Sequence, residues 1–321
     1  MTRIKQGGAM TPSRELIFIT GATGFLGSWI ISRLVDRGIG VVATDISDDH
    51  SRLALLKPDL PEGLVDFRIC DVTDGAALGA MIAETRPTGI IHLAALQIPQ
   101  CREMPGRGAA INIGGHINIF EAARENGIER IIYTSSIAAK PRGPANAPSN
   151  LYGVFKKTGE EISRIYWQDY QLASLGLRPY VVYGVGRDDG ETSAITRAIE
   201  AAALGHAYEI PFTTRSCFQY AGDVADVFVK AVTGCWGGAL LSDVTETVHS
   251  TADVLSAIQQ VVPGARITCA ATERVSPCEG FETSALQQVI GEISEMSLAE
   301  GIRETVALYR SIADRGAAKS G

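Results

Sequence analysis

The sequence predicts an α/β protein, with a doubly wound parallel sheet followed by a smaller C-terminal domain. Two observations predict this class. Short apolar runs recur through the first part of the chain, and amphipathic stretches of helical period lie between them. Strands that alternate with helices form parallel sheets, because each connecting helix packs on a face of the sheet. Beyond residue 184, Gly, Thr and Pro interrupt shorter elements, which indicates the second domain.

Each expected strand is a run that is apolar enough to be buried on both faces of a sheet. In chain order these runs are LIFIT (16–20), GVVATD (40–45), DFRICD (66–71), GIIHLAA (89–95) and RIIYTSS (130–136). The expected helices carry their apolar residues on one face. They are residues 25–38, 74–86, 111–127 and a longer helix over Leu151–Tyr170.

These elements predict how the chain divides into domains. Residues 1–13 precede the first strand and are expected to form a flexible tail. Residues 14–184 form the main α/β domain, to which a segment near residues 216–235 returns. Residues 185–321 mainly form the second domain, which we expect to bind the substrate.

The composition of the 321-residue chain excludes several classes of function. With 45% hydrophobic and 20% charged residues, the chain is typical of globular proteins. Its net charge of −7, with no run of Lys or Arg, argues against nucleic acid and membrane surfaces as partners. No apolar run reaches the ~18 residues that a membrane-spanning helix needs. A small molecule is therefore the expected partner.

The cysteines and the first residues bear on the cellular compartment. Six cysteines are scattered without a C-x-x-C pair, which predicts neither a zinc site nor a disulfide framework. The first residues lack the apolar stretch of a secretory signal. We therefore expect reduced thiols, no bound metal and a cytoplasmic protein.

A glycine-rich turn directly follows the first expected strand. It has the pattern G-x-x-G-x-x-G and leads into the first helix. Glycines let the backbone turn sharply and approach a pyrophosphate, and a helix N-terminus attracts that anion. The pattern predicts a Rossmann-type domain, although a tight strand-to-helix turn alone gives the same spacing. The expected cofactor contacts in this turn are Gly21, Thr23, Gly24, Phe25, Leu26 and Gly27.

Two aspartates end the next two expected strands. A carboxylate at Asp45 accepts hydrogen bonds from the hydroxyls of the adenosine ribose and repels a 2′-phosphate. The sequence therefore favours NAD over NADP as the cofactor. Asp71 is a candidate for binding the adenine amino group, or alternatively it caps the helix over residues 74–86.

Tyr152 and Lys156 lie four residues apart on the expected long helix, so both side chains occupy one face. A neighbouring ammonium and an oxidised nicotinamide favour the phenolate, which makes Tyr152 a candidate general base toward a substrate hydroxyl. Ser136 ends the fifth strand and is a candidate for binding the same oxygen. A Tyr–Lys pair on a helix is otherwise usually a solvated face, but this pair follows a nucleotide-binding turn and a strand that ends in serines.

Further motifs lie in a fixed order along the chain. They are HLAA (92–95), INIGG (111–115), YTSS (133–136), YGVFK (152–156), LRP (177–179), VYG (182–184) and DVA (223–225). Together with the glycine turn and the two aspartates, this set resembles the extended short-chain dehydrogenase/reductases of the NAD-dependent epimerase/dehydratase family. The resemblance covers roughly residues 15–235. It implies a catalytic triad of Ser136, Tyr152 and Lys156.

The resemblance also implies contacts with the cofactor and with a second copy of the chain. Lys156 holds the nicotinamide ribose, and Asn112 lines the site near the nicotinamide. A homodimer forms through the helices near residues 106–126 and 151–170. The remaining expected cofactor contacts are Val72, Leu93, Ala94, Ala95, Pro179 and Val181.

Departures from the family pattern bear on the substrate. Ile137 follows Ser136 where dehydratases of the family carry an Asp, so elimination of water is disfavoured. Val181 and Ser216 stand where nucleotide-sugar epimerases usually carry an Asn and a diphosphate-binding Arg. A pyrophosphate-linked sugar is therefore less favoured than a smaller substrate.

Candidate substrate contacts surround the reactive end. Arg187 and Arg215 are cations that suit a carboxylate or a small phosphate, although a surface role is the more usual explanation for an arginine such as Arg187. Gln97 follows the fourth strand, where open α/β sheets bind ligands, or it is an ordinary loop residue. Ser136 and Ile137 complete the set.

These residues predict an NAD-dependent oxidoreductase that transfers hydride between a secondary alcohol of a sugar, sugar acid or polyol and NAD. Tyr152 takes the hydroxyl proton, while Ser136 and Lys156 stabilise the oxygen. The alternative is a sugar or nucleotide-sugar epimerase, which uses the same residues but recycles its NAD internally. A dinucleotide-binding protein without catalytic activity is disfavoured, because Tyr152 and Lys156 are both present.

Overall fold

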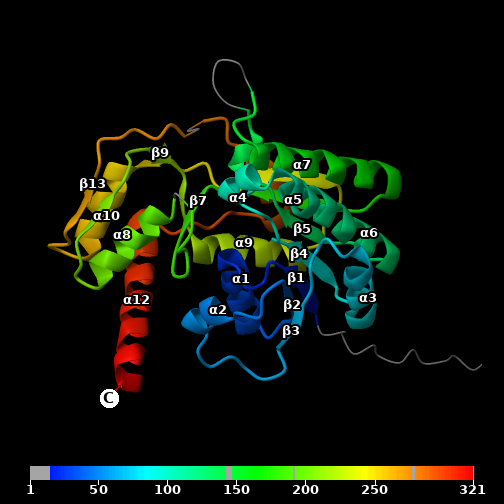
Figure 1. Ribbon diagram of the computed structural model, residues 1–321, viewed down its shortest axis with the longest axis horizontal. Helices are drawn as coiled ribbons and strands as arrows, with labels where there is room; N and C mark the ends of the chain where they lie inside the picture. Colours follow the sequence, from blue (N-terminus) through cyan, green and yellow to red (C-terminus); the bar gives the residue numbers. More distant parts are fainter. Residues whose placement is uncertain (1–14, 142–146, 191, 277–278, 321) are drawn as a thin grey trace, which may run out of the picture.

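A seven-stranded parallel sheet forms the centre of the molecule (Figure 1). The computed structural model describes residues 15–141, 147–190, 192–276 and 279–320, so the tail predicted over residues 1–13 lies outside the described residues. Every neighbouring pair of strands is parallel, which confirms the predicted fold class. In sheet order the strands are β11 (Ala239–Asp243), β6 (Ser174–Arg178), β5 (Ile131–Thr134), β4 (Gly89–His92), β1 (Leu16–Thr20), β2 (Gly40–Asp45) and β3 (Val65–Ile69).

Helices cover both faces of the sheet because the side chains of each strand alternate between them. Phe18 of β1 packs among residues of α3 and α6, whereas Ile17 and Ile19 pack with α1 and α9 on the other face. Both faces are therefore apolar, as in other parallel sheets. The helices are α1 (Phe25–Asp36), α2 (Ser51–Leu56), α3 (Gly75–Thr85), α4 (Ile98–Glu103), α5 (Pro105–Ala109), the π-helix η1 (Ala110–Gly115), α6 (His116–Asn126), the 3-10 helix η2 (Ile137–Ala139), α7 (Leu151–Tyr170) and α9 (Ala221–Thr233).

The order in which the chain adds strands to the sheet changes direction between β1 and β4. From β1 the chain builds β2 and β3 on one side, and β4, β5 and β6 on the other. In open α/β sheets, ligands bind at the carboxyl ends of the strands at such a point. The residues that follow β1 and β4 meet there.

The predicted long helix is confirmed as α7, with the predicted bounds. The side-chain oxygen of Asn150 caps it by accepting a hydrogen bond from Gly153 N at 2.8 Å. The helix ends where Gln171 takes the left-handed conformation, with φ 55°. Its first turns pack on η2, directly after the end of β5.

Three predicted strands end earlier than expected, and the first of them, predicted over residues 66–71, ends at Ile69. The strand over residues 89–95 ends at His92, whose partner on β1 is Thr20. Because β1 ends at Thr20 and the chain then turns away from the sheet, residues 93–95 have no residues of β1 to pair with. The strand over residues 130–136 likewise ends at Thr134. The residues past these three strand ends belong instead to the loops at the carboxyl edge.

The helix predicted over residues 111–127 has two parts. Ala110–Gly115 form a π-helix, and the α-helix His116–Asn126 follows without a break. A π-turn is wider than an α-turn and often occurs at functional sites. It changes the directions of the side chains that a regular helix would predict.

The second half of the chain adds a group of smaller elements and returns to the sheet. Because β11 pairs with β6, the returning segment extends past the predicted residues 216–235 as far as Asp243. Figure 1 shows α8, α10 and α12 gathered at one side of the sheet. No helix in the described ranges is long and apolar enough to cross a membrane. The smaller elements are β7 (Val181–Tyr183), α8 (Ser193–Ala203), β8 (Tyr208–Ile210), β9 (Arg215–Ser216), β10 (Phe218–Tyr220), β12 (His249–Ser250), α10 (Thr251–Val261), β13 (Ile267–Cys269), α11 (Ser284–Ile290) and α12 (Leu298–Ser320).

Candidate active site

A cavity of about 380 Å³ lies where the glycine turn, the loops after β2, β3 and β4, and the first turns of α7 meet. Of the predicted substrate contacts, Gln97 and Arg187 line it. One space therefore joins the predicted nucleotide end to the predicted reactive end. The predicted cofactor contacts that line it are Gly21, Thr23, Gly24, Phe25, Leu26, Gly27, Asp45, Asp71, Val72, Leu93, Ala94, Ala95, Tyr152, Lys156 and Pro179.

The glycine turn requires glycine at two positions. Gly21 has φ +69°, and a Cβ on it would lie 2.7 Å from Ala94 N. A Cβ on Gly27 would lie 2.5 Å from the carbonyl oxygens of Gly21 and Ala22. The tight turn brings the N-terminus of α1 to the cavity. Among the residues that the structure describes, no side chain forms a capping hydrogen bond at the N-cap residue of α1, Gly24. The N–H groups and the dipole of this helix end suit an anion such as a pyrophosphate.

Asp45 presents its carboxylate to the cavity from the end of β2. Its Oδ2 accepts hydrogen bonds from Thr23 N at 3.0 Å and from Thr23 Oγ1 at 2.7 Å. Its Oδ1 accepts one from Ile46 N at 2.8 Å. These bonds fix the carboxylate at the wall of the cavity, and a carboxylate has lone pairs enough to accept further hydrogen bonds there.

Asp71 lines the cavity and does not cap α3. Its Oδ1 accepts hydrogen bonds from Thr73 N at 2.9 Å and Thr73 Oγ1 at 2.8 Å, which lower the pKa of Asp71. The cap is Asp74, whose Oδ1 accepts from Ala77 N at 2.9 Å. The alternative interpretation of Asp71 as a helix cap is therefore wrong, and an anionic acceptor faces the cavity there.

The predicted catalytic side chains converge at the end of β5. The phenol of Tyr152 lies within hydrogen-bonding reach of Ser136, whose Oγ also accepts from Ala138 N at 3.1 Å. Lys156 Nζ donates to Thr134 O at 2.7 Å and lies 5.7 Å from the ring centroid of Tyr152. Tyr152 and Lys156 line the cavity, whereas Ser136, which interacts with Tyr152, does not.

Burial dominates the titration of both reactive groups. It raises the pKa of Tyr152 to about 12, although the neighbouring Ser136 hydroxyl acts in the opposite direction. Burial also lowers the pKa of Lys156 to about 8. Desolvation therefore favours the neutral phenol at neutral pH. A further positive charge is needed before Tyr152 acts as a base at neutral pH.

Asn112 supports the wall of the cavity from behind. Its Oδ1 accepts from Leu96 N at 2.7 Å, and its Nδ2 donates to Leu96 O at 3.0 Å and to Cys101 Sγ at 3.4 Å. The side chain is buried and does not line the cavity, whereas the neighbouring Ile111 does. The π-helix thus turns Asn112 toward the loop after β4 rather than toward the position that the resemblance implied.

Three other predicted contacts do not line the cavity. Val181 is buried in β7, and the alternation of the strand places Val182 in the cavity instead. Ile137 begins η2 and is buried under α7. Arg215 belongs to β9, where Ser250 of β12 is its strand partner.

Arg187 brings a positive charge to the reactive end. Its Nη2 donates to Thr192 Oγ1 at 3.3 Å, and its guanidinium carbon lies 5.8 Å from the ring centroid of Phe25. Burial lowers the pKa of Arg187, which stays a cation with five N–H donors. A surface role therefore does not describe this residue, since its side chain lines the cavity.

Two buried histidines beside the site are held as neutral rings. His92 Nδ1 lies 2.7 Å from Thr20 Oγ1, and His116 Nε2 lies 3.2 Å from Ser163 Oγ. Burial lowers the pKa of His116 to about 3 and that of His92 well below its usual value. In the described part of the chain, no group of three His, Cys, Asp or Glu residues is arranged to hold a metal ion.

Some lining residues are absent from the predicted set. Each lies within two positions of a predicted residue, so extending every motif by its flanking residues would find them. They are Ile46, Cys70, Leu96, Ile111, Thr134, Ser135, Tyr180 and Val182.

Comparison with known families decides the class of this site. A family model described as "NAD dependent epimerase/dehydratase family" matches residues 17–237, which include the glycine turn, both aspartates and the Tyr–Lys pair. The chain belongs to this family. Membership makes the chain an NAD-dependent enzyme, whose chemistry is hydride transfer between an alcohol and NAD. The residues fit that cofactor, because the glycine turn at the uncapped N-terminus of α1 and the carboxylate of Asp45 line the same cavity.

Individual members of the family align with nearly the whole chain. UDP-glucose 4-epimerase of Mycolicibacterium smegmatis is 29% identical over 309 residues, covering 91% of this chain and 98% of the relative. The structure of Thermus thermophilus UDP-glucose 4-epimerase in complex with NAD has a TM-score of 0.74 at 24% identity, covering 92% and 99% of the two chains. That of L-threonine dehydrogenase from Cupriavidus necator has a TM-score of 0.75 at 20% identity, covering 91% and 98%. The fold is thus shared by epimerases and dehydrogenases.

Proposed function

We propose that this enzyme oxidises a secondary alcohol of a sugar acid, sugar or polyol with NAD, using Ser136, Tyr152 and Lys156. The observation that carries the proposal is the single cavity, which contains the glycine turn, Asp45 and the Tyr–Lys pair. A cofactor held at one end of this space reaches a substrate alcohol at the other. When bound, NAD supplies the hydride acceptor and the positive charge that favours the phenolate.

Tyr152 is the general base in this proposal. Its phenolic oxygen takes the proton of the substrate hydroxyl, and Ser136 donates a hydrogen bond to the same oxygen as charge develops. Lys156 stabilises the phenolate electrostatically and binds the nicotinamide ribose. The bond from Lys156 Nζ to Thr134 O fixes the ammonium near the ring of Tyr152.

The other end of the cavity binds the nucleotide in this proposal. The N-terminus of α1 binds the pyrophosphate, Asp45 accepts from the adenosine ribose hydroxyls, and Asp71 accepts from the adenine amino group. Support comes from the fixed carboxylate of Asp45 and from the lowered pKa of Asp71.

The charges near Tyr152 favour a small anionic substrate. Arg187 lines the cavity and, being close enough to Tyr152 to act on its pKa, adds a cation at the reactive end. Ser216, which replaces the diphosphate-binding Arg of nucleotide-sugar epimerases, is fully buried in β9. These two features support a sugar acid over a sugar linked to a nucleotide diphosphate.

An epimerase is the second candidate, because the epimerase of Mycolicibacterium smegmatis aligns with nearly the whole chain. Absorbance of NADH distinguishes the two, with a panel of aldonic and uronic acids, free sugars, polyols and nucleotide sugars. Accumulation of NADH with an unactivated compound supports the dehydrogenase. Conversion of one sugar to its epimer without net NADH would instead establish the second candidate.

Replacing Asp45 by Ala is expected to weaken the preference for NAD over NADP by about 10- to 100-fold, since hydrogen bonds to a charged group contribute roughly 1.5–3 kcal/mol. The repulsion of a 2′-phosphate also disappears. The measurement is the ratio of kcat/KM for the two cofactors. Asp48→Ala, on the exposed loop after β2, is the control. An unchanged ratio in Asp45→Ala would refute the assigned role.

Replacing Arg187 by Gln is expected to raise KM for an anionic substrate by about 10- to 100-fold, because a charge-assisted hydrogen bond is lost. The KM for a matched neutral alcohol should change little, whereas kcat should fall for both substrates because loss of this cation raises the pKa of Tyr152. The measurement compares an aldonic acid with the corresponding alditol. An equal rise in KM for both substrates would show that Arg187 does not recognise the anion.

We also propose that the chain forms a homodimer through α6 and α7. Support comes from apolar side chains on these helices that are more than one third exposed, including Ile117, Val154 and Ile165. Ile117→Asp combined with Ile165→Asp is expected to convert the dimer to a monomer in sedimentation or light scattering. Val275→Asp, at an apolar residue that is 83% exposed elsewhere, is the control. A double variant that stays dimeric would exclude this interface.

The proposed location is the cytoplasm. Support comes from the five cysteines in the described residues, which are all free thiols. Free thiols persist in a reducing compartment.

A further inference from the structure

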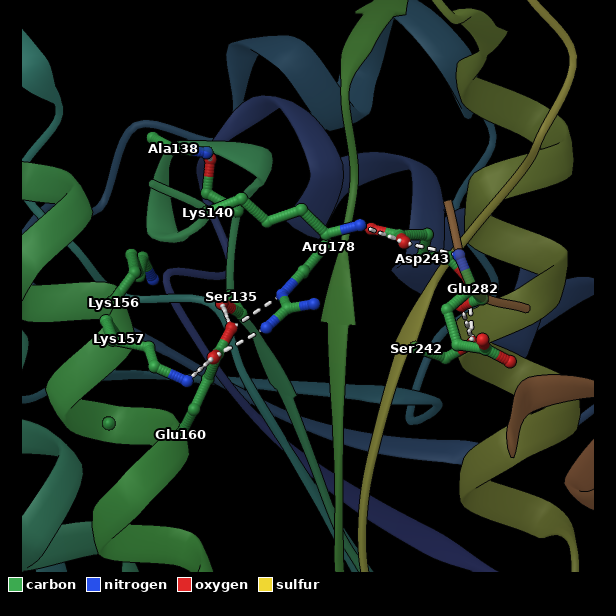
Figure 2. A network of polar contacts seen from close by, with 12 residues as sticks. Ser135, Ala138, Lys140, Lys156, Lys157, Glu160, Arg178, Ser242, Asp243 and Glu282 are labelled. Atoms are coloured by element: carbon green, nitrogen blue, oxygen red, sulfur yellow. Dashed lines mark hydrogen bonds and ion pairs between the residues drawn. The ribbon is translucent and has the colours of Figure 1, made fainter. Parts of the chain in front are cut away.

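A buried carboxylate joins α7 to the sheet beside the reactive side chains (Figure 2). Glu160 follows Tyr152 and Lys156 at intervals of four residues, so the three lie along one face of α7. The side chain of Glu160 is only 1% exposed. A carboxylate at this depth requires partners that replace its hydration.

Two of its partners are also buried or nearly buried. Glu160 Oε1 accepts from Ser135 Oγ at 2.5 Å and from Arg178 Nε at 2.7 Å, and Oε2 accepts from Arg178 Nη2 at 2.7 Å. The pair with Arg178 is thus bidentate, which fixes orientation as well as distance. Lys157 adds a longer contact to Oε2 from the exposed side, at 3.3 Å.

Three consecutive residues at the end of β5 each contact one residue of this face of α7. Thr134 O accepts from Lys156 Nζ, Ser135 bonds Glu160, and Ser136 lies within hydrogen-bonding reach of Tyr152. The helix cannot slide or rotate on β5 without straining all three contacts. The hydrogen bonds of Glu160 and the contacts of Tyr152 and Lys156 therefore depend on the same position of α7 relative to β5.

Arg178 extends the connection to the next strand. It is the last residue of β6, and Pro179, which follows it, lines the cavity. The side chain of Glu160 thus connects α7, the end of β5 and the end of β6. These are the elements that surround the reactive end of the cavity.

We propose that Glu160 is a positioning residue for the hydride transfer: through Ser135 and Arg178 it sets Tyr152 and Lys156 in place against Ser136. The inference rests on the proposed function of those three residues. Glu160 itself is not a catalytic residue, because its carboxylate is engaged by Ser135 and Arg178 and does not line the cavity.

The charge of Glu160 also acts on Lys156. Burial has the largest effect and lowers the pKa of that ammonium, whereas the negative charges of a Cys101 thiolate and of Glu160 raise it. The other groups that face Lys156 are the phenol of Tyr152 and the neutral rings of His92 and His116. Loss of the carboxylate therefore moves the pKa of Lys156 further down, so that the ammonium is lost at lower pH.

Glu160→Gln tests the proposal, with Glu161→Gln as the matched control. Glu161 is the next residue of α7, but it is exposed and pairs with Lys157 and Arg164. In Glu160→Gln we expect kcat to fall by about 10- to 100-fold, the effect of misplacing reacting groups by roughly 1 Å. KM for NAD should rise by less than kcat falls, because Lys156 is one of several proposed cofactor contacts, and the alkaline limb of the pH profile should move to lower pH. Glu161→Gln should retain the wild-type kcat and profile.

Amide hydrogen exchange provides a readout that needs no substrate. In the protein without NAD, exchange across residues 151–157 should be faster in Glu160→Gln than in the wild type or in Glu161→Gln. If Glu160→Gln does not fold, Ser135→Ala tests the same contact and keeps the ion pair with Arg178 intact.

The outcomes separate this inference from the proposed function. A wild-type enzyme that acts on none of the panel overturns the proposed function, and the exchange experiment still decides the inference. Wild-type kcat, pH profile and exchange in Glu160→Gln would overturn the inference. A lower melting temperature with unchanged kcat and pH profile would also overturn it, because Glu160 would then act on stability alone.

Discussion

Replacing Tyr152 by Phe is expected to lower kcat by about 10²- to 10⁴-fold, which is the usual contribution of a general base. The ring of Phe keeps the packing of Tyr152 in its buried site beside Ser136, so only the group that takes the proton is lost. Affinity for NAD should therefore stay close to that of the wild type. Steady-state production of NADH and calorimetric titration with NAD measure the two quantities.

Tyr166→Phe is the matched control for this substitution. Tyr166 belongs to the same helix, but its hydroxyl donates to Glu121 Oε1 at 2.6 Å, away from the cavity. Its loss should leave kcat unchanged. A Tyr152→Phe enzyme that turns over within about tenfold of the wild type would contradict the assignment of Tyr152 as the base.

Replacing Gly153 by Ala is expected to reduce both the stability and kcat. A Cβ on Gly153 would collide with the backbone carbonyl oxygen of Ala138 in η2, and its position is set by the backbone of α7. Such overpacking costs about 1–3 kcal/mol. Because the collision pushes the first turn of α7 away from Ser136, kcat should fall by roughly 100-fold. Thermal unfolding and steady-state kinetics measure the two effects.

Gly159→Ala separates this collision from the general effect of alanine in a helix. A Cβ on Gly159 would lie 3.6 Å from the ring of His116, an ordinary van der Waals distance. Alanine is favoured over glycine inside a helix by about 1 kcal/mol. Gly159→Ala should therefore raise the melting temperature and keep kcat. A rise in melting temperature for Gly153→Ala as well would show that α7 does not approach η2 so closely.

Much of the fold and of the site is predictable from local sequence patterns. The bounds of α7 follow from a long amphipathic period that starts directly after a capping residue, Asn150. The glycine turn, Asp45 and the Tyr152–Lys156 pair each lie in a motif whose spacing alone fixes their relation. The cavity brings all of them together.

The predictions that fail concern side-chain directions in irregular segments. Asn112 turns away from the cavity because it lies in a π-helix, which the sequence pattern does not distinguish from an α-helix. Ile137 is turned under α7 by the 3-10 helix η2. Glu160 is absent from the predicted set for another reason: its burial depends on Arg178, a partner on a distant strand that no local pattern relates to it.

The edge strand β11 has a consequence for the synthesis of the protein. The chain leaves the sheet after β6 and returns only at Ala239–Asp243, the segment that pairs with β6. A nascent chain that has reached β6 therefore carries an open edge of unpaired backbone N–H and C=O groups, which is prone to pair with other chains. Since domains fold as their residues emerge from the ribosome, this edge stays open until the following segment is made. Substitutions that slow the folding of that segment should lower the soluble yield of the enzyme before they change its turnover.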